Sequence, residues 1–164
     1  MPNFLEQLVA EWFEFQHYFV RRNVRVGKRE KGGYESELDV VAFNPEKQHL
    51  VHVEPSMDAD PWEKRERRFG AKFAAGQKHI PSLFIGFSAL PKLEQIALLG
   101  FAGQGGRSTL GGGRILLIGD FMNQIRADIA HPSIRNNAIP EQYVILRSLQ
   151  YAANYWKTPA GLDA

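Results

Sequence analysis

The chain of 164 residues contains no cysteine, which excludes disulfide bonds, thiolate metal sites and a cysteine nucleophile. No apolar run approaches the roughly 18 residues that a membrane span requires. The segment "MPNFLEQLVAEW" carries acids and lacks a basic region, which is not typical of a signal peptide, so we expect a cytoplasmic protein. The chain also lacks a Lys-Ser/Thr phosphate-binding loop, an H-E-x-x-H zinc motif and a G-x-S-x-G motif. These absences argue against the corresponding nucleotide, zinc and serine-hydrolase sites.

The length of the chain predicts a single domain over residues 1–164, with enough residues to bury a core. A net charge of +2 is too small to indicate a nucleic-acid partner by itself. Basic residues, however, gather in residues 20–31 and in residues 64–72. Two basic clusters that flank one candidate site favour a phosphate-bearing partner, although most such clusters are only solvated surfaces.

Hydrophobic periodicity predicts the order of helices and strands. We expect helices over residues 3–17, 60–78, 91–99, 120–130 and 140–155, and strands over residues 19–26, 35–43, 49–55, 82–87 and 115–119. Asn3, Asp60 and Asp120 are the expected N-terminal caps, and residues 100–114 form a glycine-rich loop. An antiparallel meander followed by crossover units predicts an α/β fold, with a mixed sheet flanked by helices.

Two carboxylates fall inside stretches whose apolar, β-branched composition predicts buried strands. They are Asp39 in "ESELDVVAF" and Glu54 in "LVHVEPS". If the hairpin closes around Glu46 and Lys47, Asp39 lies directly opposite Glu54, with the two Cβ atoms roughly 5 Å apart. The same register pairs apolar residues on the opposite face of the sheet, whereas a slip of one residue would spoil both faces.

Two neighbouring carboxylates repel each other unless a positive group lies between them. Hard oxygen ligands in an open, hydrated arrangement suit Mg²⁺ or Mn²⁺, so Asp39 and Glu54 are candidate metal ligands. The alternative is that both are exposed edge residues paired with arginines. His52 projects toward the same face, where a structural role is favoured over metal ligation or proton transfer.

With these residues in this order, the chain resembles the PD-(D/E)XK nuclease superfamily, and Holliday-junction resolvases within it. That family carries an aspartate on the second strand and E-x-K on the third. The counterparts here are Asp39 in "ELDVVAF", and Glu54 with Ser56 in "VEPS". Resolvase-like members also have a glutamate near the start of the first helix, which Glu6 in "FLEQLVAEW" matches. The resemblance covers roughly residues 3–87.

The resemblance implies a restriction-endonuclease-like αβββαβ core with extra C-terminal helices. It also implies a Mg²⁺-dependent deoxyribonuclease. Asp39 and Glu54 would hold the metal with the Pro55 carbonyl, and Glu6 would complete the site directly or through water.

Ser56 departs from the family, because serine cannot supply the cation of the motif lysine. In one interpretation a lysine of the following helix replaces it, since Lys64, Arg68 and Lys72 form one stripe of that helix. Lys72 or Lys64 would then reach over the carboxylates. In the other interpretation the site is degenerate, and the protein is a non-cleaving module that binds DNA or assembles with other proteins.

The partner expected from the resemblance is DNA, and phosphate contacts would come from Arg21, Arg22, Arg25, Arg67 and Arg68. Aromatic residues in "YAANYW" at the end of the last helix favour a homodimer contact there. A small-molecule enzyme on an unrelated α/β fold is a third hypothesis. Duplex, branched, single-stranded or modified DNA, and RNA, all stay open as substrates.

Overall fold

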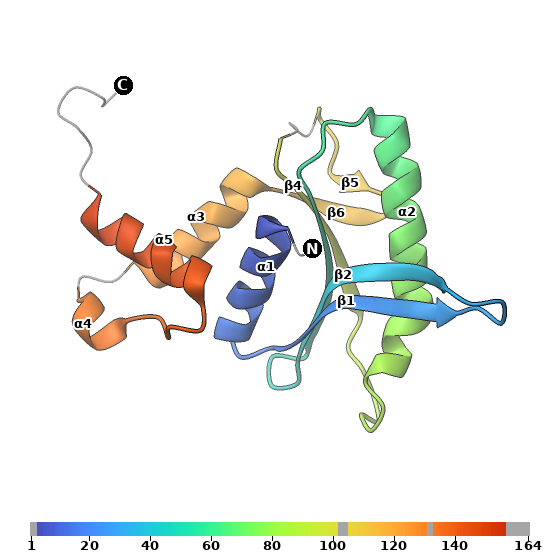
Figure 1. The fold of residues 1–164 in the computed structure, drawn as a ribbon, viewed down its shortest axis with the longest axis horizontal. Coiled ribbons are helices and arrows are strands. Elements are labelled where there is room, and N and C mark those ends of the chain that lie inside the picture. The colour runs from blue at the N-terminus through green and yellow to red at the C-terminus, as the bar shows by residue number, and fades with distance from the viewer. Residues whose placement is uncertain (1–2, 102–104, 131–132, 157–164) are drawn as a thin grey trace.

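The computed structural model describes residues 3–101, 105–130 and 133–156, which form a mixed six-stranded sheet with helices on both faces (Figure 1). The helices are α1 (Phe4–Phe15), α2 (Trp62–His79), α3 (Ile118–Ile129), α4 (Ile134–Asn137) and α5 (Val144–Tyr155), with a 3₁₀ helix η1 (Ile80–Leu83). The strands are β1 (Phe19–Lys28), β2 (Tyr34–Asn44), β3 (His49–Ser56), β4 (Leu93–Leu99), β5 (Thr109–Leu110) and β6 (Gly113–Leu117). The predicted α/β class is confirmed.

The strands lie in the order β1-β2-β3-β4-β6-β5. The neighbours β1–β2 and β2–β3 are antiparallel, β3–β4 and β4–β6 are parallel, and β5 pairs antiparallel with β6. Helix α2 lies between β3 and β4 in the chain, which suits a crossover between two parallel strands. None of the helices in the described part of the chain is long and apolar enough to cross a membrane.

The register of the β2–β3 hairpin is the predicted one. Val40 pairs with Val53 and Phe43 with Leu50. Because side chains alternate between the two faces of a strand, this register directs Glu54 and His52 to the face that α2 covers. The positions of the candidate site residues thus follow from the pattern of apolar residues on the opposite face.

Apolar residues bury both faces of the sheet. On one face, α1 and α3 pack against the sheet and α5 packs against these two helices, in a single cluster that includes Leu8, Phe121 and Leu146. On the other face lies α2 (Figure 1), whose Phe69 and Phe73 are each 2% exposed. Phe69 and Phe73 therefore pack on the sheet and fix α2 above it.

A buried carboxylate attaches the C-terminal helix to the rest of the fold. Glu11 on α1 accepts hydrogen bonds from the backbone N–H groups of Ile145 (2.9 Å) and Leu146 (3.0 Å). These N–H groups lie in the first turn of α5, where no helical carbonyl is available to accept them. Glu11 is thus a helix cap supplied from a segment more than 100 residues away in the chain, and its charge suits the positive end of the helix dipole.

Two elements between residues 82 and 99 differ from the prediction. Residues 82–87 were predicted as a strand, but they contain the end of η1 and a turn in which Gly86 has a φ of 105°. Ile85 in this turn is 90% exposed. Residues 91–99 were predicted as a helix, whereas Leu93–Leu99 is strand β4. Parallel neighbours on both sides bury β4, so tertiary pairing overrides the local helix preference.

The expected cap of the second helix is also wrong. Helix α2 begins at Trp62 with Pro61 at the N-cap position and without a side-chain cap. The Asp60 carboxylate instead accepts hydrogen bonds from Lys64 (2.9 Å) and Arg68 (3.2 Å). The side chains of Lys64 and Arg68, from the first two turns of α2, thus bind the carboxylate that was expected to cap the helix backbone.

Further differences concern the C-terminal half. The predicted loop 100–114 contains β5 and the start of β6, while residues 102–104 lie outside the described residues. Asp120 lies in the first turn of α3 rather than at its cap, because the helix already begins at Ile118. The last helix begins at Val144 rather than at Pro140, after a turn closed by the Tyr143 N–H and the Pro140 carbonyl (3.1 Å). The short helix α4 was not predicted.

Candidate active site

Both predicted carboxylates meet one of the two candidate lysines. Lys72 on α2 places its Nζ 2.5 Å from Oδ1 of Asp39 on β2 and 2.5 Å from Oε2 of Glu54 on β3. The side chains of Asp39 and Glu54 are only 14% and 2% exposed. Three elements of the sheet and helix layers thus bring one cation and two carboxylates together in a largely buried position.

The β2–β3 ladder stops at this point. The last paired residues are Val40 and Val53, and the next N–H, that of Asp39, donates to Oε1 of Glu54 at 3.1 Å. Asp39 and Glu54 therefore lie opposite each other, as the register requires, but a side chain replaces the backbone carbonyl as the acceptor. This contact helps to fix the plane of the Glu54 carboxylate.

The electrostatics of the site show a shortage of positive charge. Burial, together with a hydrogen bond and charge repulsion from Glu54, raises the pKa of Asp39 to about 7 despite the contact with Lys72. Burial lowers the pKa of Lys72, but Glu54 and Asp39 outweigh burial and raise that pKa above its usual range. The two carboxylates thus share a single lysine. A further cation would therefore stabilise the ionised form of Asp39.

His52 lies behind Glu54 and is fully buried. Its Nε2 is 2.6 Å from Oε1 of Glu54. Burial, with a smaller effect of Lys72, lowers the pKa of His52 to about 3, so the imidazole is neutral near pH 7. Because a carboxylate oxygen accepts hydrogen bonds, Nε2 carries the proton and donates a hydrogen bond to Oε1 of Glu54. The structural role favoured for this histidine is a hydrogen bond to a candidate metal ligand.

Glu6 lies at the rim of the same site. The predicted N-terminal cap of α1 is present, because the Asn3 side chain accepts from the Glu6 N–H at 2.9 Å. The Asn3 side-chain amide donates to Oε1 of Glu6 at 2.6 Å. Burial and the nearby charge of Asp39 raise the pKa of Glu6. Glu6, Asp39, Glu54 and Pro55 all line one open pocket of about 300 Å³.

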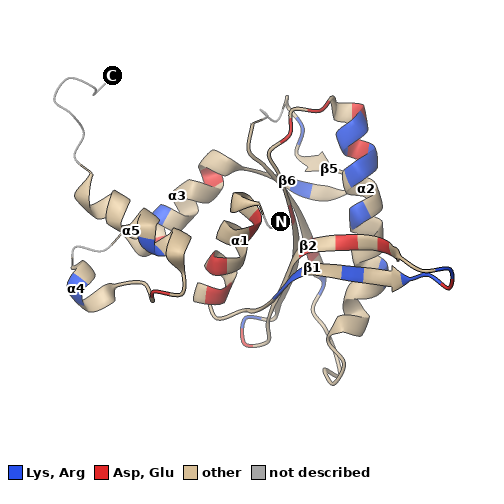
Figure 2. Ribbon diagram, viewed as in Figure 1, with Lys and Arg blue, Asp and Glu red and all other residues tan. Residues whose placement is uncertain are grey.

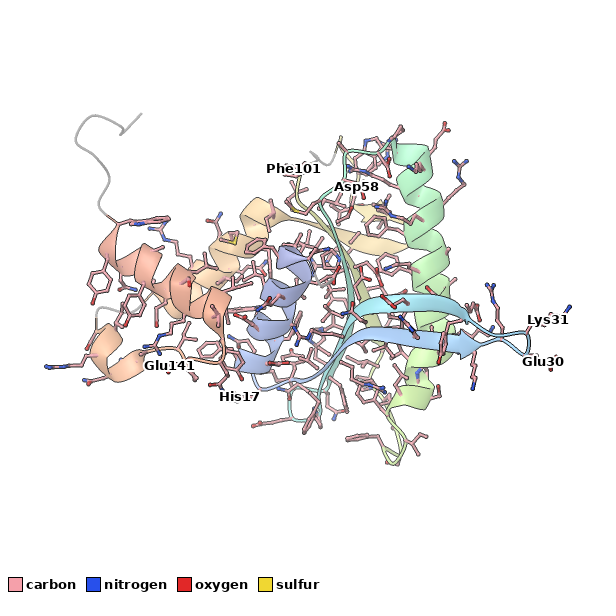
Figure 3. All side chains as sticks on the ribbon, viewed as in Figure 1. His17, Glu30, Lys31, Asp58, Phe101 and Glu141 are labelled. Carbon is pink, nitrogen blue, oxygen red and sulfur yellow. The ribbon has the colours of Figure 1, made fainter. Side chains whose placement is uncertain are left out.

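Ser56, at the position of the motif lysine, is held by a second charged cluster. The Ser56 hydroxyl donates to the carboxylate of Asp58 and accepts from Nη2 of Arg68 at 3.1 Å. Arg68 also pairs with Asp58, which lies in the loop before α2 (Figure 3). Burial would raise the pKa of Asp58, but the hydrogen bonds from Ser56 and Arg68 lower it.

Sequence reasoning missed Asp58, which lines the same pocket. Its signal was the continuation of the polar series at alternate positions, with His52, Glu54, Ser56 and Asp58 in turn. The loop after β3 keeps Asp58 close to the strand end.

The remaining predicted cations do not contact Asp39 or Glu54. Lys64 pairs with Asp60 and is 63% exposed, so it does not reach the carboxylates. Arg25 pairs with Glu37 at 3.1 Å on the surface. Arg21, Arg22 and Arg67 are exposed and have no ion pair within the described part of the chain. Figure 2 shows Lys and Arg gathered in the first half of α2, beside acidic residues of the preceding loop.

The pocket offers oxygen atoms of the kind that divalent cations bind. Oδ1 of Asp39 and Oε2 of Glu54 converge on one point, where the Lys72 Nζ lies. Carboxylate oxygens and a backbone carbonyl such as that of Pro55 are ligands that Mg²⁺ and Mn²⁺ accept. Within residues 3–101, 105–130 and 133–156, no group of three His, Asp or Glu side chains is arranged as a metal site. A cation held by Asp39 and Glu54 would take the rest of its coordination from water, as is usual for Mg²⁺.

Comparisons with known proteins give little further guidance. No family model and no curated protein matches the chain. Among solved structures, the crystal structure of AF1548, a protein of unknown function, matches with a TM-score of 0.47 and 14% sequence identity. The match covers 91% of this chain and 96% of that one.

Proposed function

We propose that the protein is a metal-dependent endonuclease that hydrolyses phosphodiester bonds in DNA. The observation that carries the proposal is the contact of Lys72 with both Asp39 and Glu54, at 2.5 Å each. In the nuclease family that the sequence resembles, a lysine acts beside this pair of acids from the position of Ser56. Here α2 supplies a lysine to the same pair, which supports a catalytic site with a relocated cation.

Asp39 and Glu54 would hold the metal, with the Pro55 carbonyl as a further ligand and Glu6 at the rim. A bound Mg²⁺ or Mn²⁺ supplies Lewis acidity for the phosphoryl group and lowers the pKa of a coordinated water. Lys72, freed from one carboxylate when a cation shares their charge, would donate a hydrogen bond to a phosphate oxygen and stabilise the charge that develops there.

The exposed arginines would bind the DNA backbone. Arg21, Arg22 and Arg67 can contact phosphates without first breaking an ion pair within the described residues. Arg25 and Arg68 would have to exchange carboxylate partners for phosphate. Binding through phosphates releases counterions, so affinity should fall steeply as salt rises. Affinity that does not change between low and high salt would contradict the DNA assignment.

Cleavage of labelled DNA tests the proposal. Linear, branched and single-stranded substrates are incubated with the wild type and with Asp39→Asn, in Mn²⁺, Mg²⁺ or EDTA. We expect cutting of at least one substrate in the presence of metal, and loss of cutting in EDTA and in the variant. A folded wild-type protein that cuts none of them would contradict the proposal.

A second candidate function is a non-cleaving module that binds DNA or a protein partner. The observation that favours it is Ser56, whose hydroxyl is engaged by Asp58 and Arg68. In such a protein Lys72 would be a permanent structural counter-ion for the two acids. Mn²⁺ binding separates the two functions, because the module has no need to bind the ion through Asp39 and Glu54. The homodimer through α5 stays a prediction, with Tyr155 exposed at the end of that helix and Trp156 exposed directly after it.

A further inference from the structure

We propose that His52 and Gln95 are positioning residues, which aim Glu54 at the metal and hold the helix that carries Lys72 at a fixed distance from it. The inference rests on the proposed metal-dependent function and adds two residues that do not touch the reacting groups. It is carried by a continuous series of hydrogen bonds from β4 through β3 to the carboxylate. Gln95 on β4 begins the series, and Glu54 ends it.

Every hydrogen-bonding atom along this series has one consistent role. The side-chain amide of Gln95 donates to the Phe73 carbonyl at 2.9 Å and lies 3.2 Å from Nδ1 of His52. Gln77 donates to the Gln95 side-chain oxygen at 2.9 Å, which orients the amide so that its NH₂ faces the histidine. Nδ1 must then be the acceptor, and Nε2 must carry the proton. Only this tautomer can donate to Glu54.

The two carboxylate oxygens of Glu54 have different partners. Oε1 accepts from His52 at 2.6 Å and from the Asp39 N–H at 3.1 Å. The other oxygen, Oε2, pairs with Lys72 at 2.5 Å. Hydrogen bonds to the outer atoms of a metal ligand fix its orientation and typically change metal affinity about 10–100-fold when removed.

Gln95 also contacts helix α2. It donates a hydrogen bond to the carbonyl of Phe73, the residue that directly follows Lys72. The approach is close because residue 76 is glycine, where a Cβ would lie 2.4 Å from Nδ1 of His52. The Gln95 side chain thus connects β4, the strand beside β3, with the segment of α2 that carries Lys72.

Two substitutions of His52 distinguish positioning from simple core packing. His52→Gln keeps a neutral amide donor near the position of Nε2, whereas His52→Leu fills the space without any donor. If His52 only fills the core, leucine should serve at least as well as glutamine. If it positions Glu54, glutamine should preserve Mn²⁺ affinity and leucine should weaken it roughly tenfold or more.

The measurement is the dissociation constant of Mn²⁺, read from the electron paramagnetic resonance signal of free ion. Gln95→Met is measured as well, with Gln124→Met on the exposed surface of α3 as the matched control. We expect weaker binding in Gln95→Met and no change in the control. Nitrogen NMR of His52 should show the neutral Nε2–H tautomer in the wild type, and a mixture of tautomers in Gln95→Met.

Three outcomes would overturn the inference. Wild-type affinity in His52→Leu would show that no donor is needed, and it would leave the metal site standing. A wild-type histidine with its proton on Nδ1 would break the series of donors and acceptors. Absence of Mn²⁺ binding in the wild type would instead remove the proposed function, and the positioning role with it.

Discussion

Replacing Lys72 by methionine should destabilise the protein, because Lys72 is the cation between two largely buried carboxylates. Methionine keeps the length of the side chain but leaves Asp39 and Glu54, at 14% and 2% exposure, without the cation between them. Removing one partner of a buried ion pair costs about 3–5 kcal/mol. The lysine is 27% exposed, and Asp39 can take up a proton. We therefore expect a loss of about 2–3 kcal/mol at pH 8 in EDTA.

Thermal unfolding measures this effect. For a chain of this size, about 1 kcal/mol shifts the melting temperature by roughly 2–4 °C, so Lys72→Met should melt some 4–12 °C below the wild type. Mn²⁺ should raise the melting temperature of the variant more than that of the wild type, since the ion no longer competes with an ammonium group. Lys64→Met is the control and should change stability by less than about 0.5 kcal/mol, because its ion pair lies on the surface. A variant that melts with the wild type in EDTA would refute this account of the charges.

Three further predictions concern stability. Gly76→Ala should destabilise the protein by about 1–2 kcal/mol in urea titration, since its Cβ would lie 2.4 Å from Nδ1 of His52. The control is Gly70→Ala in the same helix, whose Cβ would have its nearest atom at 3.9 Å, so this variant should be neutral or stabilising. Equal effects of the two substitutions would contradict the close packing at residue 76. Glu11→Ala should cost about 2 kcal/mol by the same titration, because one buried and one partly buried N–H group lose a charged acceptor. An unchanged midpoint would show that α5 does not need this cap. Because the folded state raises the pKa of Asp39 from 3.8 to about 7, the metal-free folded protein holds a proton there that the unfolded chain releases. The free energy of unfolding in EDTA should therefore decline as pH rises from 4 to 7, by up to about 4 kcal/mol from this group. Asp39→Asn should lack that decline. Identical pH profiles of stability for the wild type and the variant would mean that Asp39 titrates normally.

The hairpin could be predicted because two independent patterns agree on it. The apolar residues of one face and the carboxylates of the other fit a single register, and the observed pairing of Val40 with Val53 is that register. The cap at Asn3 was likewise predictable from local spacing. Such features depend on residues close together in the chain, or on one strict alternation.

Other features depend on distant residues and could not be read locally. The segment Leu93–Leu99 is a strand because β3 and β6 flank it. Lys64 and Lys72 share one stripe of α2, and only the position of the helix over the sheet decides that Lys72 meets the carboxylates while Lys64 meets Asp60. The contact between the Gln95 amide and Nδ1 of His52 joins residues 43 positions apart in the sequence.

The most direct test of the central claim is the rate at which Mn²⁺-loaded protein cleaves DNA when the lysine is removed. Lys72→Ala and Lys64→Ala are compared with the wild type on the substrate that the wild type cuts best, at saturating Mn²⁺. The account predicts that Lys72→Ala loses at least about 100-fold in rate, as removal of one group that stabilises transition-state charge does, while Lys64→Ala cleaves like the wild type. Undiminished cleavage by Lys72→Ala would contradict the claim that this lysine completes the site.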